Sequence, residues 1–281
     1  MKWRTLGVSV LATVGLAALA ACKEEPASSP RTPVTTAPAG ERGAPAATPV
    51  APEPEPEAPL TGGGTVQGSI TFKGTPPAGA AITPSQDPAC DGMPLTDQAV
   101  QVTGGKLSNV LVRVRGLMPR SRRAQPIIVD QQHCAYSPRV QGAVTGQPVL
   151  IKNSDGTLHN ARALSGAKSI FNVAQPPNGK AVQRPLPADV EVVHLKCDIH
   201  PWMTSWVIIN PNPFFATSNA QGAFSIEHLP AGTYSLEAWH ETLGTKTAEV
   251  TVKEGEASPV AFEFSSADLK AAPPAPSPAG K

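Results

Sequence analysis

Short runs of aliphatic and β-branched residues recur along the middle of this chain, and glycine or proline bounds most of them. With 32 prolines and 24 glycines among 281 residues, long helices are disfavoured. Short strands joined by tight turns are typical of β-sandwiches, so we expect an all-β chain. The expected strands are residues 65–72, 109–115, 127–130, 148–153, 190–196 and 207–209, followed by 214–217, 223–226, 234–240, 247–252 and 260–264.

One of these runs indicates which side chains face a core. Along residues 190–196, a period of two places Val193, Leu195 and the following Cys197 on one face. His194 lies on the opposite face, and we expect it to point to solvent. Cys197 is therefore predicted to end a strand with its thiol directed inward.

Metal-binding side chains are concentrated directly after this strand. Cys197, His200 and Met203 lie within seven residues of one another, and His159 lies upstream. Two imidazoles and one thiolate in a plane, with a weak axial thioether, form the ligand set of a mononuclear electron-transfer copper centre. A structural zinc site is instead closed by four Cys or His ligands. The sequence therefore predicts one copper ion at these four residues.

The chain from Pro148 to Ile209 resembles a cupredoxin. The resemblance lies in Asn153-Ser154-Asp155 at the end of a strand, in His159-Asn160 in a loop, and in the order of Cys197, His200, Pro201 and Met203. The compact ligand loop is most similar to that of amicyanin.

This resemblance implies a Greek-key sandwich that holds a type 1 copper ion. His159, Cys197 and His200 would be the equatorial ligands and Met203 the axial one. Asn160 would support the site by tying the upstream loop to the cysteine loop.

Apolar residues next to His200 indicate a docking surface for a redox partner. Ile199, Pro201 and Trp202 flank this histidine, and transient redox complexes use small interfaces. We expect an electron carrier that exchanges single electrons with a periplasmic protein such as a c-type cytochrome. The alternative is a non-redox copper-binding or storage protein, or a structural or adhesive module of the cell envelope.

A second unit follows near Pro213. The pattern Gly222-Ala-Phe224, Leu229-Pro230-Ala-Gly232-Thr-Tyr234-Ser-Leu236 resembles the carboxypeptidase regulatory-like, transthyretin-related β-sandwich module. We therefore expect a copper domain at residues 65–212 and this smaller sandwich at residues 213–264. The strand 65–72 is assignable to either unit.

The two ends of the chain are expected to lie outside these sandwiches. Residues 1–21 have the architecture of a signal peptide, and Leu19-Ala20-Ala21-Cys22 resembles a bacterial lipoprotein box. Cys22 would carry the lipids that anchor the protein to a membrane. The proline-rich residues 22–64 predict a disordered tether, and residues 265–281 predict a disordered tail. We expect a location in the cell envelope, with the outer membrane favoured.

The four cysteines divide by role. An export signal places them in an oxidising compartment, where pairing is expected. Because Cys22 is assigned to lipid and Cys197 to metal, Cys90 and Cys134 remain as the predicted disulfide.

Other functions receive little support. A net charge of +1 without a basic run argues against nucleic-acid binding. None of the six histidines forms the His-x-His pair by which multicopper enzymes recruit further ions, and no serine nucleophile elbow or phosphate loop is present. We expect a protein that is not an enzyme.

Overall fold

The computed structural model describes residues 60–83, 85–94, 96–117 and 125–269, all of which belong to one compact unit. The residues expected to form the signal peptide, Cys22 and most of the expected tether and tail lie outside the described residues. Apart from two short 3-10 helices, every regular element described is a strand, so the chain is all-β as expected. None of the helices described has the length or apolar character needed to cross a membrane.

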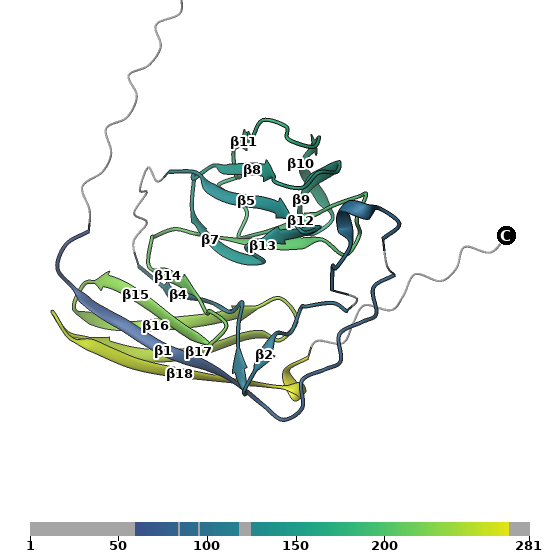
Figure 1. Ribbon diagram of the computed structural model, residues 1–281. Helices are drawn as coiled ribbons and strands as arrows, with labels where there is room; N and C mark the ends of the chain where they lie inside the picture. The colour runs from purple at the N-terminus through teal and green to yellow at the C-terminus, as the bar shows by residue number, and fades with distance from the viewer. Residues whose placement is uncertain (1–59, 84, 95, 118–124, 270–281) are drawn as a thin grey trace, which may run out of the picture. The chain divides into compact units, whose positions relative to one another are not determined.

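The middle of the chain forms two sheets, which we call the site sandwich. Their order is β10-β9-β12-β13-β7 in one sheet and β11-β8-β5-β6 in the other (Figure 1). The strands are β5 (Ile127–Gln132), β6 (Ala135–Ser137), β7 (Val140–Val144), β8 (Val149–Asn153), β9 (His159–Ser165), β10 (Lys168–Gln175), β11 (Val182–Arg184), β12 (Val192–Lys196) and β13 (Thr204–Asn210).

The alternation predicted for β12 is confirmed on its inner face. Val193, Leu195 and Cys197 are all buried. His194 does lie on the other face, but the expectation that it points to solvent is wrong. Its ring stacks on Trp206, the residue opposite it on β13, with ring centroids 3.8 Å apart. Burial and nearby positive charges lower the pKa of His194 to about 4.

The first and last strands form a second pair of sheets, which we call the terminal sandwich. One sheet has the order β15-β1-β3-β2, with β18 also paired to β1, and the other has the order β14-β4-β16-β17. The strands are β1 (Gly64–Lys73), β2 (Val102–Thr103), β3 (Lys106–Leu107), β4 (Leu111–Arg115), β14 (Phe215–Thr217), β15 (Ala223–Leu229), β16 (Gly232–His240), β17 (Gly244–Val252) and β18 (Ala257–Ser265).

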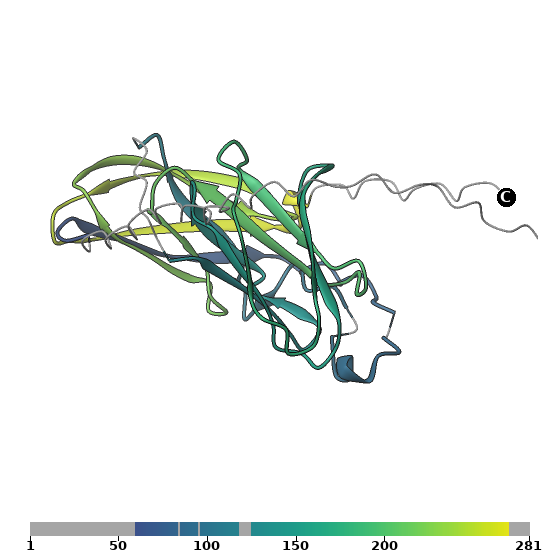
Figure 2. The same ribbon diagram turned by 90° about the horizontal axis from the view of Figure 1, so that it is seen from above.

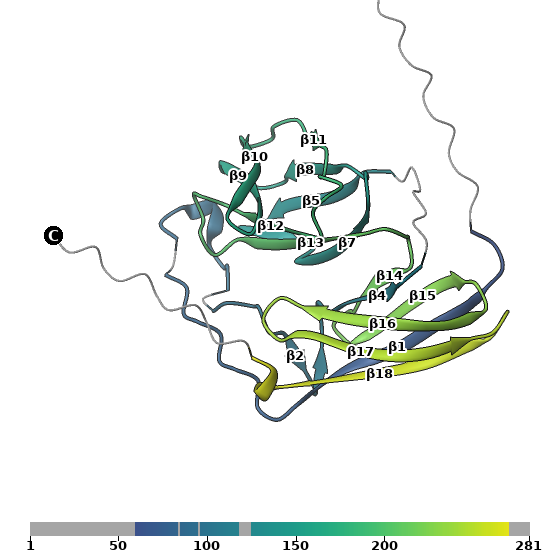
Figure 3. The same cartoon turned by 180° about the vertical axis from the view of Figure 1, so that it is seen from behind.

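Strand pairing answers the question of where residues 65–72 belong. β1 pairs in parallel with β18 from Thr65 to Lys73, and the two strands run alongside each other in Figure 2. β4 pairs with β14 and β16, and β16 lies beside β17 in Figure 3. The pairing therefore does not follow the expected boundary at 212/213, because the site sandwich is inserted between β4 and β14.

The terminal sandwich also extends further than the expected tail allowed. β18 continues to Ser265, and the short helix η2 (Ser266–Asp268) follows it. Lys246 Nζ lies 2.5 Å from Asp268 Oδ1. The expectation of disorder from residue 265 is therefore corrected for residues 265–268, which are held by these contacts.

The contacts that join the sandwiches include an ion-pair network and a close approach of two strands. Buried Arg113 of β4 bonds Glu237 of the terminal sandwich and Glu191, which precedes β12 in the site sandwich. At Gly142 of β7, an added Cβ would lie only 2.2 Å from the ring of Phe215 on β14. Glycine at this position therefore allows the close approach of the two strands.

The connection from β1 to β2 leaves the terminal sandwich and reaches the site sandwich. We call residues 74–83, 85–94 and 96–101 the cover segment. It contains the short helix η1 (Pro88–Cys90), which lies beside the site sandwich in Figure 1. Cys90 forms a disulfide with Cys134, in the turn between β5 and β6. The predicted disulfide is thus confirmed.

Candidate metal centre

The four residues predicted to bind metal lie on one strand and in the connection that follows the neighbouring strand of the same sheet. β9 and β12 are antiparallel neighbours. His159 is the first residue of β9, not part of a loop as expected, and Cys197 directly follows β12. His200 and Met203 lie in the connection from β12 to β13. The pairing of two strands therefore brings residues distant in sequence to one end of the sandwich.

Three donor atoms converge in a buried group. One ligand atom each from His159, Cys197 and His200 lies within 4.8 Å of the other two. The two histidines approach through their Nδ1 atoms, which are 2.9 Å apart, and Cys197 Sγ lies 3.9 Å from His200 Nδ1. The exposed fractions are 0% for His159, 2% for Cys197 and 3% for His200. Met203 is also buried and belongs to the same apolar cluster as Cys197.

Asn160 joins β9 to the cysteine loop. Its Oδ1 accepts hydrogen bonds from the Asp198 backbone N–H (2.7 Å) and from Cys197 Sγ (3.3 Å). Its Nδ2 donates to Asn172 Oδ1 and to Asp198 Oδ2. The backbone N–H of His200 lies 3.4 Å from Cys197 Sγ. The Asn160 contacts hold the thiol and its loop in place, and the His200 N–H is a donor that favours the ionised form of the thiol.

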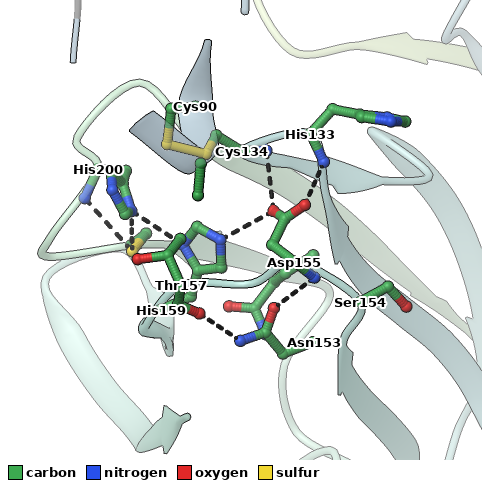
Figure 4. A network of polar contacts seen from close by, with 12 residues as sticks. Cys90, His133, Cys134, Asn153, Ser154, Asp155, Thr157, His159 and His200 are labelled. Atoms are coloured by element: carbon green, nitrogen blue, oxygen red, sulfur yellow. Dashed lines mark hydrogen bonds and ion pairs between the residues drawn. A yellow bond between two sulfur atoms is a disulfide. The ribbon is translucent and has the colours of Figure 1, made fainter. Parts of the chain in front are cut away.

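A buried carboxylate holds the outer face of His159. Asp155 Oδ2 lies 2.9 Å from His159 Nε2, so the opposite nitrogen, Nδ1, is directed toward His200 (Figure 4). A carboxylate in this position fixes both the tautomer and the orientation of a metal-binding imidazole.

The same carboxylate stabilises a strained turn. His133 and Cys134 form the two-residue turn between β5 and β6, with φ values of 54° and 52°. Such turns favour glycine or asparagine because other residues pay a steric cost of roughly 1 kcal/mol each at positive φ. The Asp155 carboxylate accepts both backbone N–H groups, at 2.6 and 2.9 Å. The turn is thus held by Asp155 and by the disulfide at Cys134.

A second carboxylate faces the outer nitrogen of His200. Asp87, in the cover segment, places Oδ2 3.6 Å from His200 Nε2. The Thr157 hydroxyl donates to the same oxygen at 2.5 Å. Asp87 Oδ1 accepts the Ala89 backbone N–H and so begins η1. The bonds from Thr157 and Ala89 lower the pKa of the Asp87 carboxyl, with a smaller effect from His200.

The electrostatics of the group favour a thiolate. Burial raises the pKa of the Cys197 thiol, but hydrogen bonds from His159 and from backbone N–H groups lower it to a net value below the ordinary one. Burial lowers the pKa of His159, but Cys197 and Asp155 raise it by more, to above its usual range. Burial and the neighbouring His159 lower the pKa of His200. Metal binding is therefore expected to displace a proton held between Cys197 and His159.

The donor set fits a soft or borderline metal ion. Imidazole nitrogen and thiolate sulfur suit copper, while carboxylate and carbonyl oxygens would suit magnesium or calcium. Two other clusters have ligand atoms close together, but both include Cys134, whose sulfur is bonded to that of Cys90. Among the described residues, the group of His159, Cys197 and His200 is the one whose thiol is free.

The residues expected to dock a partner differ in exposure. Ile199 is 47% exposed, and Pro201 is also exposed. Trp202 is half-buried and donates its indole N–H to the Cys134 carbonyl at 2.9 Å. Leu158, which the sequence did not single out, is exposed next to His159. The exposed apolar residues adjacent in sequence to the two histidines are therefore Leu158, Ile199 and Pro201.

Sequence reasoning missed the residues that hold the two histidines from outside. Asp155 belonged to the Asn153-Ser154-Asp155 stretch, and its position four residues before His159 is a usable signal. Asp87 and Thr157 carried no such signal, because Asp87 is brought to the site only by the disulfide three residues later.

Comparisons of the sequence and of the structure with known proteins match different parts of the chain. The family model of polysaccharide lyase family 4, domain II, matches residues 212–260. This segment overlaps the one for which the carboxypeptidase regulatory-like module was expected, and that expectation stays a prediction. No curated protein matches the sequence.

Solved structures similar to part of the chain include a purple cupredoxin, amicyanin and a copper-containing nitrite reductase. A purple cupredoxin from Nitrosopumilus maritimus has 21% identity and a TM-score of 0.27, covering 30% of this chain and 99% of its own. A reduced amicyanin variant has 17% identity and a TM-score of 0.28, covering 35% and 98%. A copper-containing nitrite reductase from Thermus scotoductus has 16% identity and a TM-score of 0.26, covering 35% and 25%.

Proposed function

We propose that this chain is an extracytoplasmic type 1 copper protein that carries single electrons between redox partners and is not an enzyme. The observation that carries the proposal is the convergence of His159 Nδ1, His200 Nδ1 and Cys197 Sγ in one buried group. Met203, buried in the same cluster, would be the axial ligand. When bound, copper would supply a one-electron couple between its +1 and +2 states.

The protein residues would keep this site nearly unchanged during the cycle. Asp155 fixes the ring of His159, and Asn160 fixes the cysteine loop. Small rearrangement favours fast electron transfer, and hydrogen bonds around the ligands also tune the metal. The exclusion of water from a pocket of this burial lowers the local dielectric and so contributes to the potential.

Partner and location are proposed from the sequence and from the exposed apolar residues. Leu158, Ile199 and Pro201 would contact a periplasmic redox protein such as a c-type cytochrome over a small interface. Lipids on Cys22 would anchor the chain to a bacterial membrane, with the tether separating the folded part from it. For residues 213–264 we propose a structural role in the cell envelope.

The burial of His200 favours a second candidate. A cover over the ligands would also suit a protein that binds or stores copper without transferring electrons. The two functions differ in one property, because a carrier must cycle reversibly at the metal.

The test is an anaerobic redox titration of the copper-loaded chain. We expect one copper per chain, intense visible absorption from thiolate-to-copper charge transfer, and a reversible one-electron transition. Copper-loaded protein that is colourless and redox-silent would exclude the carrier and leave storage. A chain that binds copper under neither reducing nor oxidising conditions would exclude both the electron carrier and the storage protein.

A further inference from the structure

We propose that the cover segment is a built part of the metal centre: the Cys90–Cys134 disulfide clamps it over the ligands, and through Asp87 it positions His200. This inference deepens the proposed function and rests on it for the role of His200 as a ligand. The closure itself is a property of the metal-free protein.

The first observation is the burial of a ligand group that lies at the end of a sandwich. His200 is 3% exposed although its neighbours Ile199 and Pro201 are exposed. The cover segment contributes Asp87, which faces His200 Nε2. Cys90, Met93 and Cys134 form a small buried cluster beside it, against which Trp202 packs. The cover segment thus occupies the side from which the outer edge of His200 would otherwise be reached.

The second observation is that paths of contacts lead from the two cysteines of one disulfide to the two histidines. From Cys134, the path runs through its backbone N–H to Asp155 Oδ2 and on to His159 Nε2. From Cys90, it runs through η1 to Asp87, whose main-chain carbonyl accepts the Cys90 N–H at 2.9 Å. Each histidine therefore has a carboxylate facing its outer nitrogen, and each of these two aspartates accepts the backbone N–H of one cysteine of the disulfide.

The third observation is that the cover segment has little regular structure to hold it in place. Its short helix η1 is a single turn. The residues before η1 are joined to those after it by one antiparallel β-bridge, between Ala81 and Thr96. Asp97 makes a partly exposed ion pair with Arg139 at 3.2 Å, and pairs of this kind contribute little to stability. The attachment at the metal site therefore depends on the disulfide, on the small apolar cluster around it and on the Asp87–Thr157 bond.

The closure is tested by the reactivity of Cys197 in the metal-free, full-length chain. Native protein is exposed to iodoacetamide, and mass spectrometry of the Cys197 peptide gives the alkylation rate. We expect the Cys90→Ser/Cys134→Ser double variant to react at least about tenfold faster than wild type, because a buried thiol reacts only through local opening. Circular dichroism checks that the variant is folded. Equal rates in folded wild type and variant would overturn the clamp.

Positioning by Asp87 is tested in variants that keep the disulfide, and these decide the matter if the double variant does not fold. We compare Asp87→Asn with Asp91→Asn, an exposed aspartate of the same segment. Nitrogen NMR of the metal-free chain reports the tautomer of the His200 ring. We expect one tautomer in wild type and Asp91→Asn, and a mixture in Asp87→Asn.

In copper-loaded protein, Asp87→Asn should also shift the reduction potential, with partial return in Asp87→Glu. A His200 signal and a potential that are the same in Asp87→Asn and Asp91→Asn would refute the positioning role. Neither the alkylation rate nor the tautomer requires bound metal. If the chain binds no copper but shows both effects, the proposed role of the cover segment therefore stands and only the proposed copper function is refuted.

Discussion

The two sandwiches have different interiors. The terminal sandwich is filled with aliphatic and aromatic side chains, including Ile70, Leu236 and Phe264. In the site sandwich, the interior also includes His159 and Cys197, several buried amides and the Asp155 carboxylate. Buried polar groups are costly unless each is hydrogen-bonded, and the site sandwich has a disulfide and a cover segment as additional supports. The comparison suggests that one sandwich is built mainly for stability and the other gives up apolar packing for chemistry.

The largest effect is expected from Cys197→Ser. Removal of the thiolate should abolish the visible charge-transfer absorption and lower copper affinity by more than about 100-fold, since hydroxyl is a poor ligand for this ion. Thermal unfolding of the metal-free terminal sandwich should be unchanged. Copper titration followed by visible absorption measures the colour and the copper affinity, and calorimetry measures the thermal unfolding. If Cys197→Ser kept the visible absorption of wild type, the copper site would not be the one assigned to the site sandwich.

Two equally buried leucines allow the effect of copper on the stability of each sandwich to be compared. Leu195 and Leu236 are both fully buried, one in each sandwich. Each Leu→Ala change should cost about 2–5 kcal/mol. Because bound metal stabilises only the structure that holds it, copper should offset the loss in Leu195→Ala but not in Leu236→Ala.

Calorimetry with and without copper makes this comparison. Equal rescue of both variants would show that the two sandwiches unfold as a single cooperative unit, which contacts such as Arg113 with Glu191 and Glu237 would explain.

A smaller effect is expected for Asp155→Asn. The amide keeps the shape of the carboxylate but not its charge, so the backbone and His159 contacts weaken. Loss of such an outer partner typically costs 10–100-fold in metal affinity, or roughly 1.4–2.7 kcal/mol. Competition with a copper chelator measures it, and Ser154→Ala, at an exposed neighbouring position, serves as the control. Unchanged affinity in Asp155→Asn would show that His159 needs no orienting partner.

The smallest effect concerns pH and the terminal sandwich. Burial and nearby Arg139 lower the pKa of His240 to about 4, against about 6.5 in an unfolded chain. As pH falls below the unfolded value, the unfolded state gains a proton that the folded state does not, and stability is lost. The loss from this residue should be about 1 kcal/mol near pH 5.5.

Urea unfolding at several pH values should show this dependence reduced in His240→Asn. The asparagine oxygen can replace Nδ1, which accepts the backbone N–H groups of Thr242 and Leu243. An identical pH dependence in the variant would assign the loss to other groups, such as His194.

The strands found from sequence were those with clear apolar patterns. β12 and β18 alternate or are rich in aliphatic residues, and both were expected close to their observed bounds. β9, β10 and β7 were missed. β9 begins His-Asn-Ala-Arg, β10 contains Lys, Ser, Asn and Gln, and β7 contains Gly142. Their strand conformation comes from pairing with neighbours, which a local pattern does not register.

The candidate site was accessible from sequence where its residues are close together. Cys197, His200 and Met203 share one loop, so their spacing alone indicated a ligand set. Asp87 reaches the site through a disulfide, and the membership of β1 depends on β18 at the far end of the chain. Such long-range pairings are not encoded in any short segment.

The insertion of one sandwich within the other has a consequence for synthesis. A ribosome completes β5 to β13 before any of β14 to β18 has been made, so the site sandwich has all its strands while β1 still lacks β18, its longest partner. An unpaired strand edge invites wrong association. A chain that ended before β18 would therefore leave this edge of β1 without its parallel partner and open to pairing with another chain.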